Sequence, residues 1–207
     1  STFSKVSYAC DDVSGTTTIS SDCSSAFSIT GSNADITLSA TASSSSMRLT
    51  NSGTNSSLTI TSSGSLISTN GGIVIDGTVS GKSFDLISNA GTISATSFTI
   101  RNEEIITTLT NTGTITATEG NGAILNKDSG TITTFTNSGT ISAPNGQGIM
   151  NTGTITTLTN TGTITGSGED LSNYAGTMVT LNNSQGKNGD DPLQLERFST
   201  NYNIIIN

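Results

Sequence analysis

A five-residue motif, Asn-x-Gly-Thr-Ile, recurs along this chain and constrains its fold more than any other feature. In the second half of the chain, successive copies lie alternately nine and 14 residues apart, so one full unit has 23 residues. Weaker copies nearer the N-terminus keep the register, with units of about 22 to 27 residues. The copies begin at Ser62, Asn89, Asn111, Asp128, Asn137, Asn151, Asn160 and Tyr174. A repeat of this length is typical of a solenoid, in which each unit packs only against its neighbours.

The repeat unit has no helical period and instead has the pattern of short strands. In its clearest copy, the segments 154–156, 157–159 and 163–165 each place one apolar residue between two threonines. Such alternation turns the middle side chain to one face of a strand and its neighbours to the other. We therefore predict an all-β chain that folds as a right-handed parallel β-helix. Eight or so rungs spaced by about 4.8 Å would make a rod roughly 40 Å long.

Stacking of the units aligns their apolar residues in three inward-facing ladders. We predict a first ladder of Ile60, Ile87, Leu109, Phe135, Leu158 and Leu181. The second consists of Leu66, Ile93, Ile115, Ile141 and Ile164, and the third of Phe84, Ile106, Ile132, Ile155 and Met178. Like residues fall on like in all three, which is the strongest sequence evidence for the fold.

The Asn and Gly residues of the motif are expected at the corners between strands. Glycine there indicates either a positive φ or a position with no room for a Cβ atom. Asparagine tolerates the left-handed region. Its side-chain amide can also bond the amide of the next turn, so stacked copies would form a ladder along the rod.

The two ends of the chain differ from the regular repeat. Residues 1–50 carry apolar alternation without the Gly motif, and we predict an N-terminal cap with the first rungs there. Residues 51–207 are predicted to form the β-helix, with a polar insertion over 182–201. The strand-like run 203–207 suggests that the natural protein continues. Ser1 replaces an initiator Met and no signal-peptide pattern follows it, so we interpret the chain as a mature fragment.

Two cysteines, Cys10 and Cys23, lie near the N-terminus. A zinc site needs four ligands, and the chain has no histidine to complete one. Two buried, reduced thiols are one interpretation. A disulfide is favoured because both residues lie in a polar stretch rich in Ser and Asp, and because closing this loop would stabilise the fold by roughly 3 kcal/mol. A disulfide implies an oxidising compartment on the export route.

Composition excludes several classes of partner. Only 11% of residues are charged, and the net charge is -8. Seven scattered Lys and Arg residues cannot form a basic stripe for nucleic acid, nor can they dock the chain on an anionic membrane. No apolar run approaches the roughly 20 residues of a transmembrane helix. We expect neither nucleic-acid binding nor direct membrane insertion by this chain.

The acidic residues do not predict a catalytic centre. They occur as the pairs Asp11-Asp12, Glu103-Glu104, Glu169-Asp170 and Asp190-Asp191, which fall at different points of the repeat. Glycoside hydrolysis needs two carboxylates that face each other, and a conventional serine triad needs a histidine, which the chain lacks. We interpret the pairs as solvated loop charges. We expect no catalytic residues, no cofactor and no metal site.

Variable loops are the best candidates for a binding site. The two Asn-x-Gly corners lie nine residues apart in every clear copy, so length variation is expected at the third corner, in the segments 117–127, 143–147 and 166–170. Loops that gather on one face of a repeat protein often contact partners. Merely tolerated insertions are the alternative. The predicted polar strip consists of Glu119, Asn121, Asn145, Gln147, Glu169 and Asp170.

The repeats of Asn-x-Gly-Thr-Ile, with Leu-x-Asn between them, resemble the passenger domains of Gram-negative autotransporters. The segment Tyr202–Asn207 resembles the end of passengers related to the vacuolating-cytotoxin group. The resemblance covers roughly residues 50–207. It implies export across the inner and outer membranes, display at the cell surface or release from it, and an autochaperone and membrane barrel beyond this chain.

The resemblance favours a non-catalytic adhesin or interaction scaffold. Its expected partner is a host-cell surface protein, a glycan or another copy of the chain. The alternative is part of a secreted, toxin-like passenger. Two further alternatives are a carbohydrate-active β-helix and an ice-binding protein. Ice binding is suggested by the outward pairs Thr114/Thr116, Thr131/Thr133, Thr154/Thr156 and Thr163/Thr165.

Overall fold

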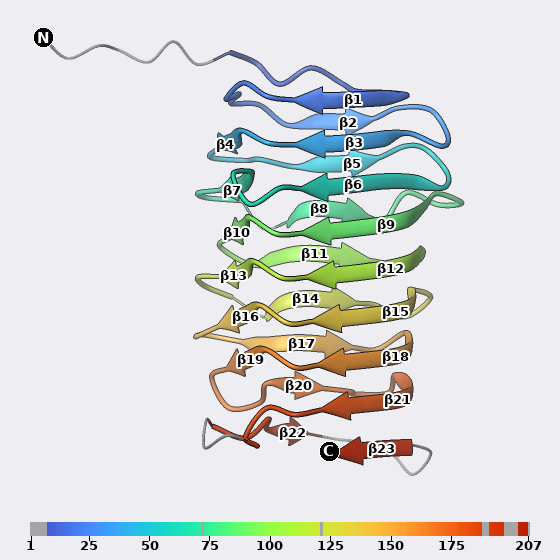
Figure 1. Cartoon of the computed structure of the whole chain (residues 1–207), viewed down its shortest axis with the longest axis vertical. Coiled ribbons are helices and arrows are strands. Elements are labelled where there is room, and N and C mark those ends of the chain that lie inside the picture. The colour runs from blue at the N-terminus through green and yellow to red at the C-terminus, as the bar shows by residue number, and fades with distance from the viewer. Residues whose placement is uncertain (1–7, 72, 121, 188–190, 197–202, 207) are drawn as a thin grey trace, which may run out of the picture.

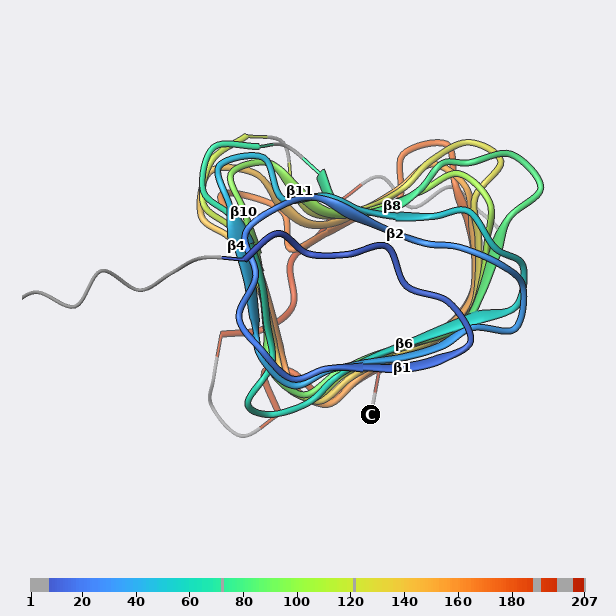
Figure 2. The same cartoon turned by 90° about the horizontal axis from the view of Figure 1, so that it is seen from above.

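The chain folds as a parallel β-solenoid of about seven turns, with about 23 residues in each turn. The computed structural model describes residues 8–71, 73–120, 122–187, 191–196 and 203–206, and this part of the chain contains no helix. The turns stack from the N-terminal end to the C-terminal end (Figure 1). Seen along the stack, they outline a three-sided cross-section (Figure 2). The predicted fold class is therefore confirmed.

Each side of the solenoid is one parallel sheet. Sheet I contains β1 (Thr16–Ile19), β3 (Asp35–Leu38), β6 (Ser56–Ile60), β9 (Ser83–Asn89), β12 (Ile105–Asn111), β15 (Thr131–Asn137), β18 (Thr154–Asn160), β21 (Thr177–Asn183) and β23 (Asn203–Ile206). Sheet II contains β4 (Thr41–Ser44), β7 (Ser65–Ser68), β10 (Thr92–Ala95), β13 (Thr114–Ala117), β16 (Thr140–Ala143) and β19 (Thr163–Gly166). Sheet III contains β2 (Phe27–Ile29), β5 (Leu49–Asn51), β8 (Ile73–Gly77), β11 (Phe98–Asn102), β14 (Gly122–Asn126), β17 (Gln147–Asn151), β20 (Leu171–Ser172) and β22 (Leu195–Glu196).

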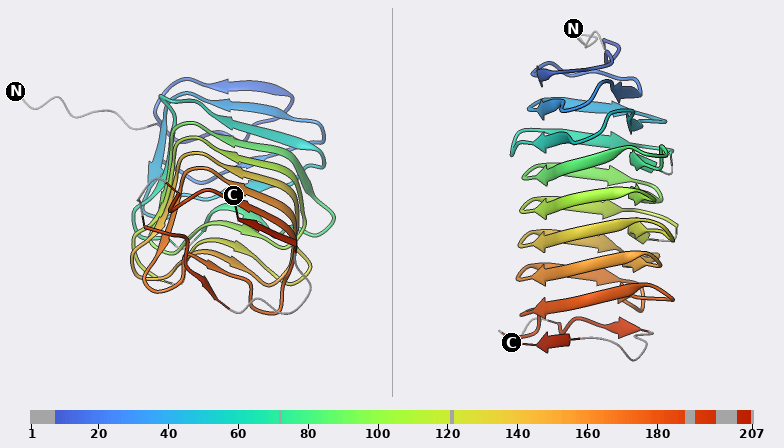
Figure 3. Two further views of the ribbon diagram at one scale, coloured as in Figure 1. Left: turned by 60° about the horizontal axis from the view of Figure 1, so that its bottom comes forward. Right: turned by 90° about the vertical axis from the view of Figure 1, so that its right-hand side faces the viewer.

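The strands of sheet I are longer than predicted. The segments 154–156 and 157–159 form one seven-residue strand, β18, rather than two short ones. Ile155 and Leu158 both point inward and are fully buried. Leu158 is three positions after Ile155, so the two successive threonines between them, Thr156 and Thr157, both remain partly exposed. Figure 3 shows the strands of this sheet stacked one above another.

The predicted apolar ladders form the core of sheets I and II. Strand pairing aligns Ile106 with Phe84 and Ile132, and it aligns Leu109 with Ile87 and Phe135. One assignment was wrong: Ile60 pairs with Asn89, while Leu58 pairs with Ile87. Ile60 thus occupies the place that Asn89 takes in the next turn, and the register between β6 and β9 also shifts after Ser56.

Sheet III was not predicted. Residues 122–126 and 147–151 were assigned wholly or partly to a corner, but they form β14 and β17. In β14 all five residues are buried, so the strand lacks the apolar–polar alternation that marks a half-exposed strand. The inward column of this sheet runs through Phe27, Leu49, Ile75, Ile100, Ile124, Ile149, Leu171 and Leu195.

The corners vary in length on both sides of sheet III. From β9 onward, two residues always connect sheet I to sheet II. The connections that enter and leave sheet III differ from turn to turn, for example 118–121 against 144–146 on one side and 78–82 against 152–153 on the other. Length variation was predicted at one corner only. That segment contains a strand of sheet III with a loop on each side, and the two loops together account for the length variation predicted at a single corner.

Buried asparagines form two amide ladders inside the corners, the first mainly from motif residues and the second mainly from asparagines outside the motif. In the first ladder each side-chain Nδ2 donates to the Oδ1 of the next turn at 2.8 Å, from Asn89 through Asn111, Asn137 and Asn160 to Asn183. The second runs from Asn102 through Asn126 and Asn151 to Asn173, at 2.5–2.8 Å. These residues have ordinary backbone φ values. The amide-ladder role of the motif is confirmed. The ladder asparagines need no left-handed backbone, whereas Asp128, the first residue of one motif copy, has a φ of 41°.

The glycines of the first corner are required by lack of space. A Cβ atom on Gly91, Gly113, Gly139 or Gly162 would lie 2.1–2.2 Å from the carbonyl oxygen of the glycine one turn earlier. None of these four residues has a positive φ. Of the two reasons predicted for glycine, close backbone approach is therefore the one that applies here.

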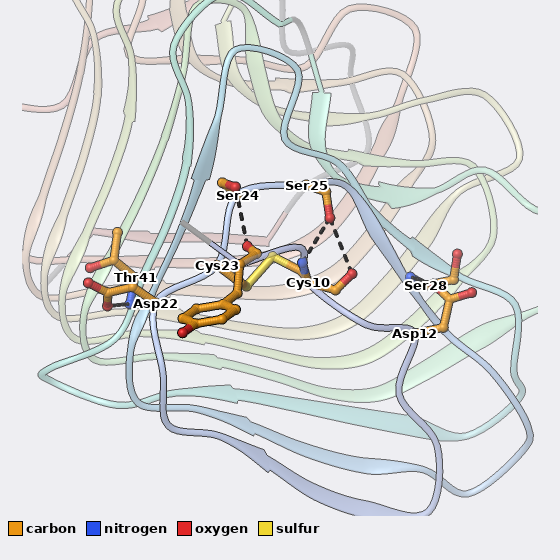
Figure 4. Close-up of a disulfide and its surroundings, with 9 residues drawn as sticks. Cys10, Asp12, Asp22, Cys23, Ser24, Ser25, Ser28 and Thr41 are labelled. Carbon is orange, nitrogen blue, oxygen red and sulfur yellow. Dashed lines mark hydrogen bonds between the residues drawn. A yellow bond between two sulfur atoms is a disulfide. The ribbon is translucent and has the colours of Figure 1, made fainter. Parts of the chain in front are cut away.

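The N-terminal end of the stack is held by a disulfide between Cys10 and Cys23 (Figure 4). Around it, carboxylates bond the backbone of the first strands. An oxygen of Asp12 accepts a hydrogen bond from the Ser28 N–H at 2.7 Å, and one of Asp22 accepts from the Thr41 N–H at 2.9 Å. Since Ser28 and Thr41 belong to β2 and β4, these bonds cover the N-terminal edges of sheets III and II.

Candidate functional site

A polar hollow of about 250 Å³ lies on the outside of the solenoid, where sheet II leads into sheet III. Three successive turns contribute to it. The first supplies Gly120, the second supplies residues 145–147 with Met150 of β17, and the third supplies residues 167–169. Strand stacking brings these segments together although Gly120 precedes Asn145 by 25 positions and Met150 precedes Ser167 by 17. The hollow is therefore a product of the solenoid, not of one loop.

Polar side chains in the hollow are held in defined positions. Gln147 Nε2 donates a hydrogen bond to Glu169 Oε2 at 2.8 Å. Asn145 Nδ2 donates to the Thr118 carbonyl oxygen at 2.9 Å, and its Oδ1 has no partner among the described residues. The Gln147 Oε1 atom is buried and likewise has no hydrogen-bond donor in that part of the chain. The arrangement leaves acceptor oxygens unsatisfied beside a carboxylate.

Backbone contacts keep the loops of the hollow in place. The Ser167 N–H donates to the Gly146 carbonyl at 2.7 Å, and the Gly146 N–H donates to that of Ala143 at 3.0 Å. A Cβ atom on Gly168 would meet nothing within 4 Å, so this residue borders open space. The Met150 side chain points outward, opposite the buried Ile149, and gives the hollow an apolar surface.

The predicted polar strip is only partly assembled. Asn145, Gln147 and Glu169 lie together in the hollow. Glu119 is exposed but does not line it, and Asn121 lies outside the described residues. The sequence reasoning missed Met150 and Ser167. The signal for Met150 is the strand register, since it pairs with Leu125 on the outer face of sheet III, whereas Ser167 lies in the loop after β19.

Asp170 corrects the expectation that the acidic pairs are solvated. Its side chain is buried, and the residue is 6% exposed. One carboxylate oxygen accepts a hydrogen bond from the Gly166 N–H at 2.8 Å, and the other accepts from the Gln194 N–H at 2.7 Å. Backbone donors at a tight corner need such acceptors. Asp170 thus holds the loop in place through these two hydrogen bonds, and its buried carboxylate is not accessible to a ligand.

Two further acidic residues are used in ion pairs at other places on the solenoid. The buried carboxylate of Asp76 bonds the Arg48 guanidinium, with 2.5 Å between Arg48 Nη2 and Asp76 Oδ2. Glu103 pairs with Arg101 and lies 3.6 Å from Lys127 Nζ. Glu103 belongs to the corner between sheets III and I, whereas Glu169 belongs to the corner between sheets II and III. These carboxylates do not face one another.

A second, larger hollow of about 480 Å³ lies at the N-terminal end, among residues 8–13 and 17–23. It contains the disulfide and apolar residues such as Val13 and Ile19. These residues continue the core, so this hollow is the end of the solenoid interior. The disulfide itself indicates an extracytoplasmic location, because disulfides persist in oxidising compartments.

Comparison with protein-family models, with curated proteins and with solved structures found no match to this chain. The fold therefore defines the class of protein, a parallel β-solenoid. Within the described residues, no helix is long and apolar enough to cross a membrane.

Proposed function

We propose that the chain is a non-catalytic, surface-displayed passenger segment of an autotransporter that acts as an adhesin or interaction scaffold. One observation carries the proposal: loops of three turns converge on an outer hollow with unsatisfied acceptors at Asn145 and Gln147. The partner is a component of a host-cell surface or of a neighbouring cell.

The use of charge elsewhere supports a binding role over catalysis. Asp76 and Asp170 are buried in structural hydrogen bonds, and Glu103 is engaged by cations at a different corner. Glu169 is left as the only charged residue that lines the hollow. A single carboxylate without a facing partner suits recognition better than acid–base hydrolysis of a glycoside. The repeated motif and the disulfide agree with an exported passenger.

Adhesion of the purified chain to cultured host cells tests the proposal. A variant with both Asn145→Ala and Glu169→Ala should adhere less, because it loses the polar groups of the hollow. The matched control changes Thr107 and Thr133 to Ala on the exposed face of sheet I. Adhesion of the wild type no stronger than that of an unrelated acidic protein would contradict the proposal. Loss of cell viability without adhesion would favour the toxin-like passenger instead.

Ice binding is a second candidate, and the outer face of sheet II favours it. Its outward residues form two registered columns in which all but Ile67 carry a hydroxyl and none is charged. The columns are Thr41, Ser65, Thr92, Thr114, Thr140 and Thr163, and Ser43, Ile67, Ser94, Thr116, Ser142 and Thr165. The other two predicted threonine pairs lie on sheet I. Thermal hysteresis that Thr116→Lys removes would support this function, and hysteresis equal to that of a control protein would reject it.

A further inference from the structure

We propose that the hollow between sheets II and III binds one neutral sugar residue of a surface glycan, an inference that rests on the adhesin function proposed above. Small-molecule sites combine apolar walls with a few placed polar groups. Here Met150 supplies the apolar surface, and Asn145, Gln147 and Glu169 supply the polar groups.

The size of the hollow limits the ligand to about one sugar ring. Its volume of about 250 Å³ is below the roughly 300–1,000 Å³ of sites for drug-sized molecules. Gly120, Gly146 and Gly168 all border it, and at Gly168 a Cβ atom would project into open space. A longer glycan would place one residue in the hollow and continue along the rod.

The polar groups of the hollow mainly lack donors, and sugar hydroxyls are donors. Asn145 is exposed, and Nδ2 of its amide donates to the Thr118 carbonyl, which orients an Oδ1 that has no donor among the described residues. Glu169 has one oxygen engaged by Gln147, which orients the carboxylate and leaves the other oxygen available. The buried Gln147 Oε1 lacks a donor altogether. An unsatisfied buried acceptor is unfavourable, and a hydroxyl that enters beside a rotated Gln147 amide would satisfy it.

Charge selects against acidic sugars. Glu169 lines the hollow, Glu119 precedes it by two turns, next to Gly120, and the residues that line the hollow include no Lys or Arg. A sialic or uronic acid would bring a carboxylate next to Glu169, where like charges repel. A neutral hexose or N-acetylhexosamine meets no such repulsion.

Nuclear magnetic resonance titration tests the inference at the site itself. We expect millimolar galactose, mannose or N-acetylglucosamine to shift the side-chain amide signals of Asn145 and Gln147, with N-acetylneuraminic acid causing smaller shifts. Gly168→Leu should weaken binding at least tenfold, because the added side chain projects into open space without displacing its neighbours. The matched control is Thr133→Leu, on the exposed face of sheet I.

Each outcome bears on the inference. No shift with any neutral sugar, or equal binding by Gly168→Leu and wild type, overturns it. Shifts caused by calcium alone would assign the hollow to a cation instead. Cell adhesion measured with the same two variants separates this inference from the adhesin function. Adhesion that survives without sugar binding refutes only the sugar site, whereas sugar binding without adhesion refutes only the adhesin role.

Discussion

The side-chain amide of Gln185 bonds both backbone groups of Ile164. Its Oε1 accepts from the Ile164 N–H at 2.8 Å, and its Nε2 donates to the Ile164 carbonyl at 3.0 Å. Ile164 lies in β19, the last strand of sheet II in the described chain. One amide therefore stands in for a further strand. The same Oε1 accepts from Asn160 Nδ2 at 3.1 Å, and the Gln185 carbonyl accepts from Nδ2 of Asn183, the last member of the first amide ladder, at 3.2 Å. An open sheet edge is a template for unwanted pairing.

Replacement of Gln185 by Leu should destabilise the C-terminal turns by about 1–3 kcal/mol, because buried backbone groups lose their partner. Hydrogen exchange of the Ile164 amide should accelerate accordingly. Gln194→Leu is the control, since that side chain is exposed and bonds only the Pro192 carbonyl. Unchanged exchange at Ile164 would show that Gln185 does not cap the sheet.

The first amide ladder should be most sensitive in its middle. Asn137 accepts from Asn111 and donates to Asn160, so Asn137→Leu leaves one amide on each side without its hydrogen-bond partner. Asn89 stands at the end of the ladder, next to Ile60, and its Oδ1 has no partner in the described structure. Asn89→Leu therefore leaves fewer amide groups without a hydrogen-bond partner. Urea unfolding should show a larger loss for Asn137→Leu, by about 1–3 kcal/mol. Equal losses would argue against a cooperative ladder.

A methyl group at the glycine corner should be poorly tolerated. In Gly113→Ala the new Cβ would lie 2.2 Å from the Gly91 carbonyl oxygen and 2.6 Å from the Ala90 carbonyl carbon. Backbone must move, at a cost of about 1–3 kcal/mol or more. Gly168→Ala meets open space and should leave the thermal midpoint unchanged. A stable Gly113→Ala variant would contradict the close stacking of this corner.

Inward and outward residues of one strand should differ strongly. Phe135 is fully buried in β15, and Phe135→Ala should cost about 3–5 kcal/mol because it leaves a cavity. Thr133 in the same strand is exposed, and Thr133→Ala should stay within about 0.5 kcal/mol of wild type. Denaturant titration of both variants checks the assignment. Similar losses would mean that the two faces are misassigned.

The disulfide should resist alkylation until it is reduced. Iodoacetamide without reductant should add no mass at Cys10 or Cys23, which are bonded to each other. After reduction it should add two labels, and the N-terminal turns should lose roughly 3 kcal/mol, as expected for a loop of this length. Two labels on the unreduced protein would refute the bond.

Much of the fold could be predicted from local sequence patterns, because each turn of a solenoid contacts only its neighbours. Apolar residues recur at the positions of Ile132 and Leu158 in successive units, so their stacking follows from the period. The Asn and Gly positions follow in the same way. Ile60 was misplaced because it stands where the next turn has Asn89, so that Leu58 and not Ile60 continues the column of Ile87.

The candidate site could be predicted from the sequence only in part. Asn145, Gln147 and Glu169 were chosen as loop residues, and the structure brings them together. Met150 was missed because its strand is buried among glycine and apolar residues and shows no alternation. Asp170 was misjudged because its two hydrogen-bond donors come from residues 4 and 24 positions away, and one of them belongs to the next turn.

The period, the inward columns of sheets I and II, the first amide ladder and the cysteine pairing could be predicted from the sequence, because each repeats or depends on a short stretch of chain. The start of sheet III, the burial of Asp76 and Asp170, the closure of sheet II by Gln185 and the side chains that meet in the hollow follow from the tertiary structure alone. These features depend on corners of unequal length. Their geometry is set by the turn stacked above or below, and no local pattern contains it.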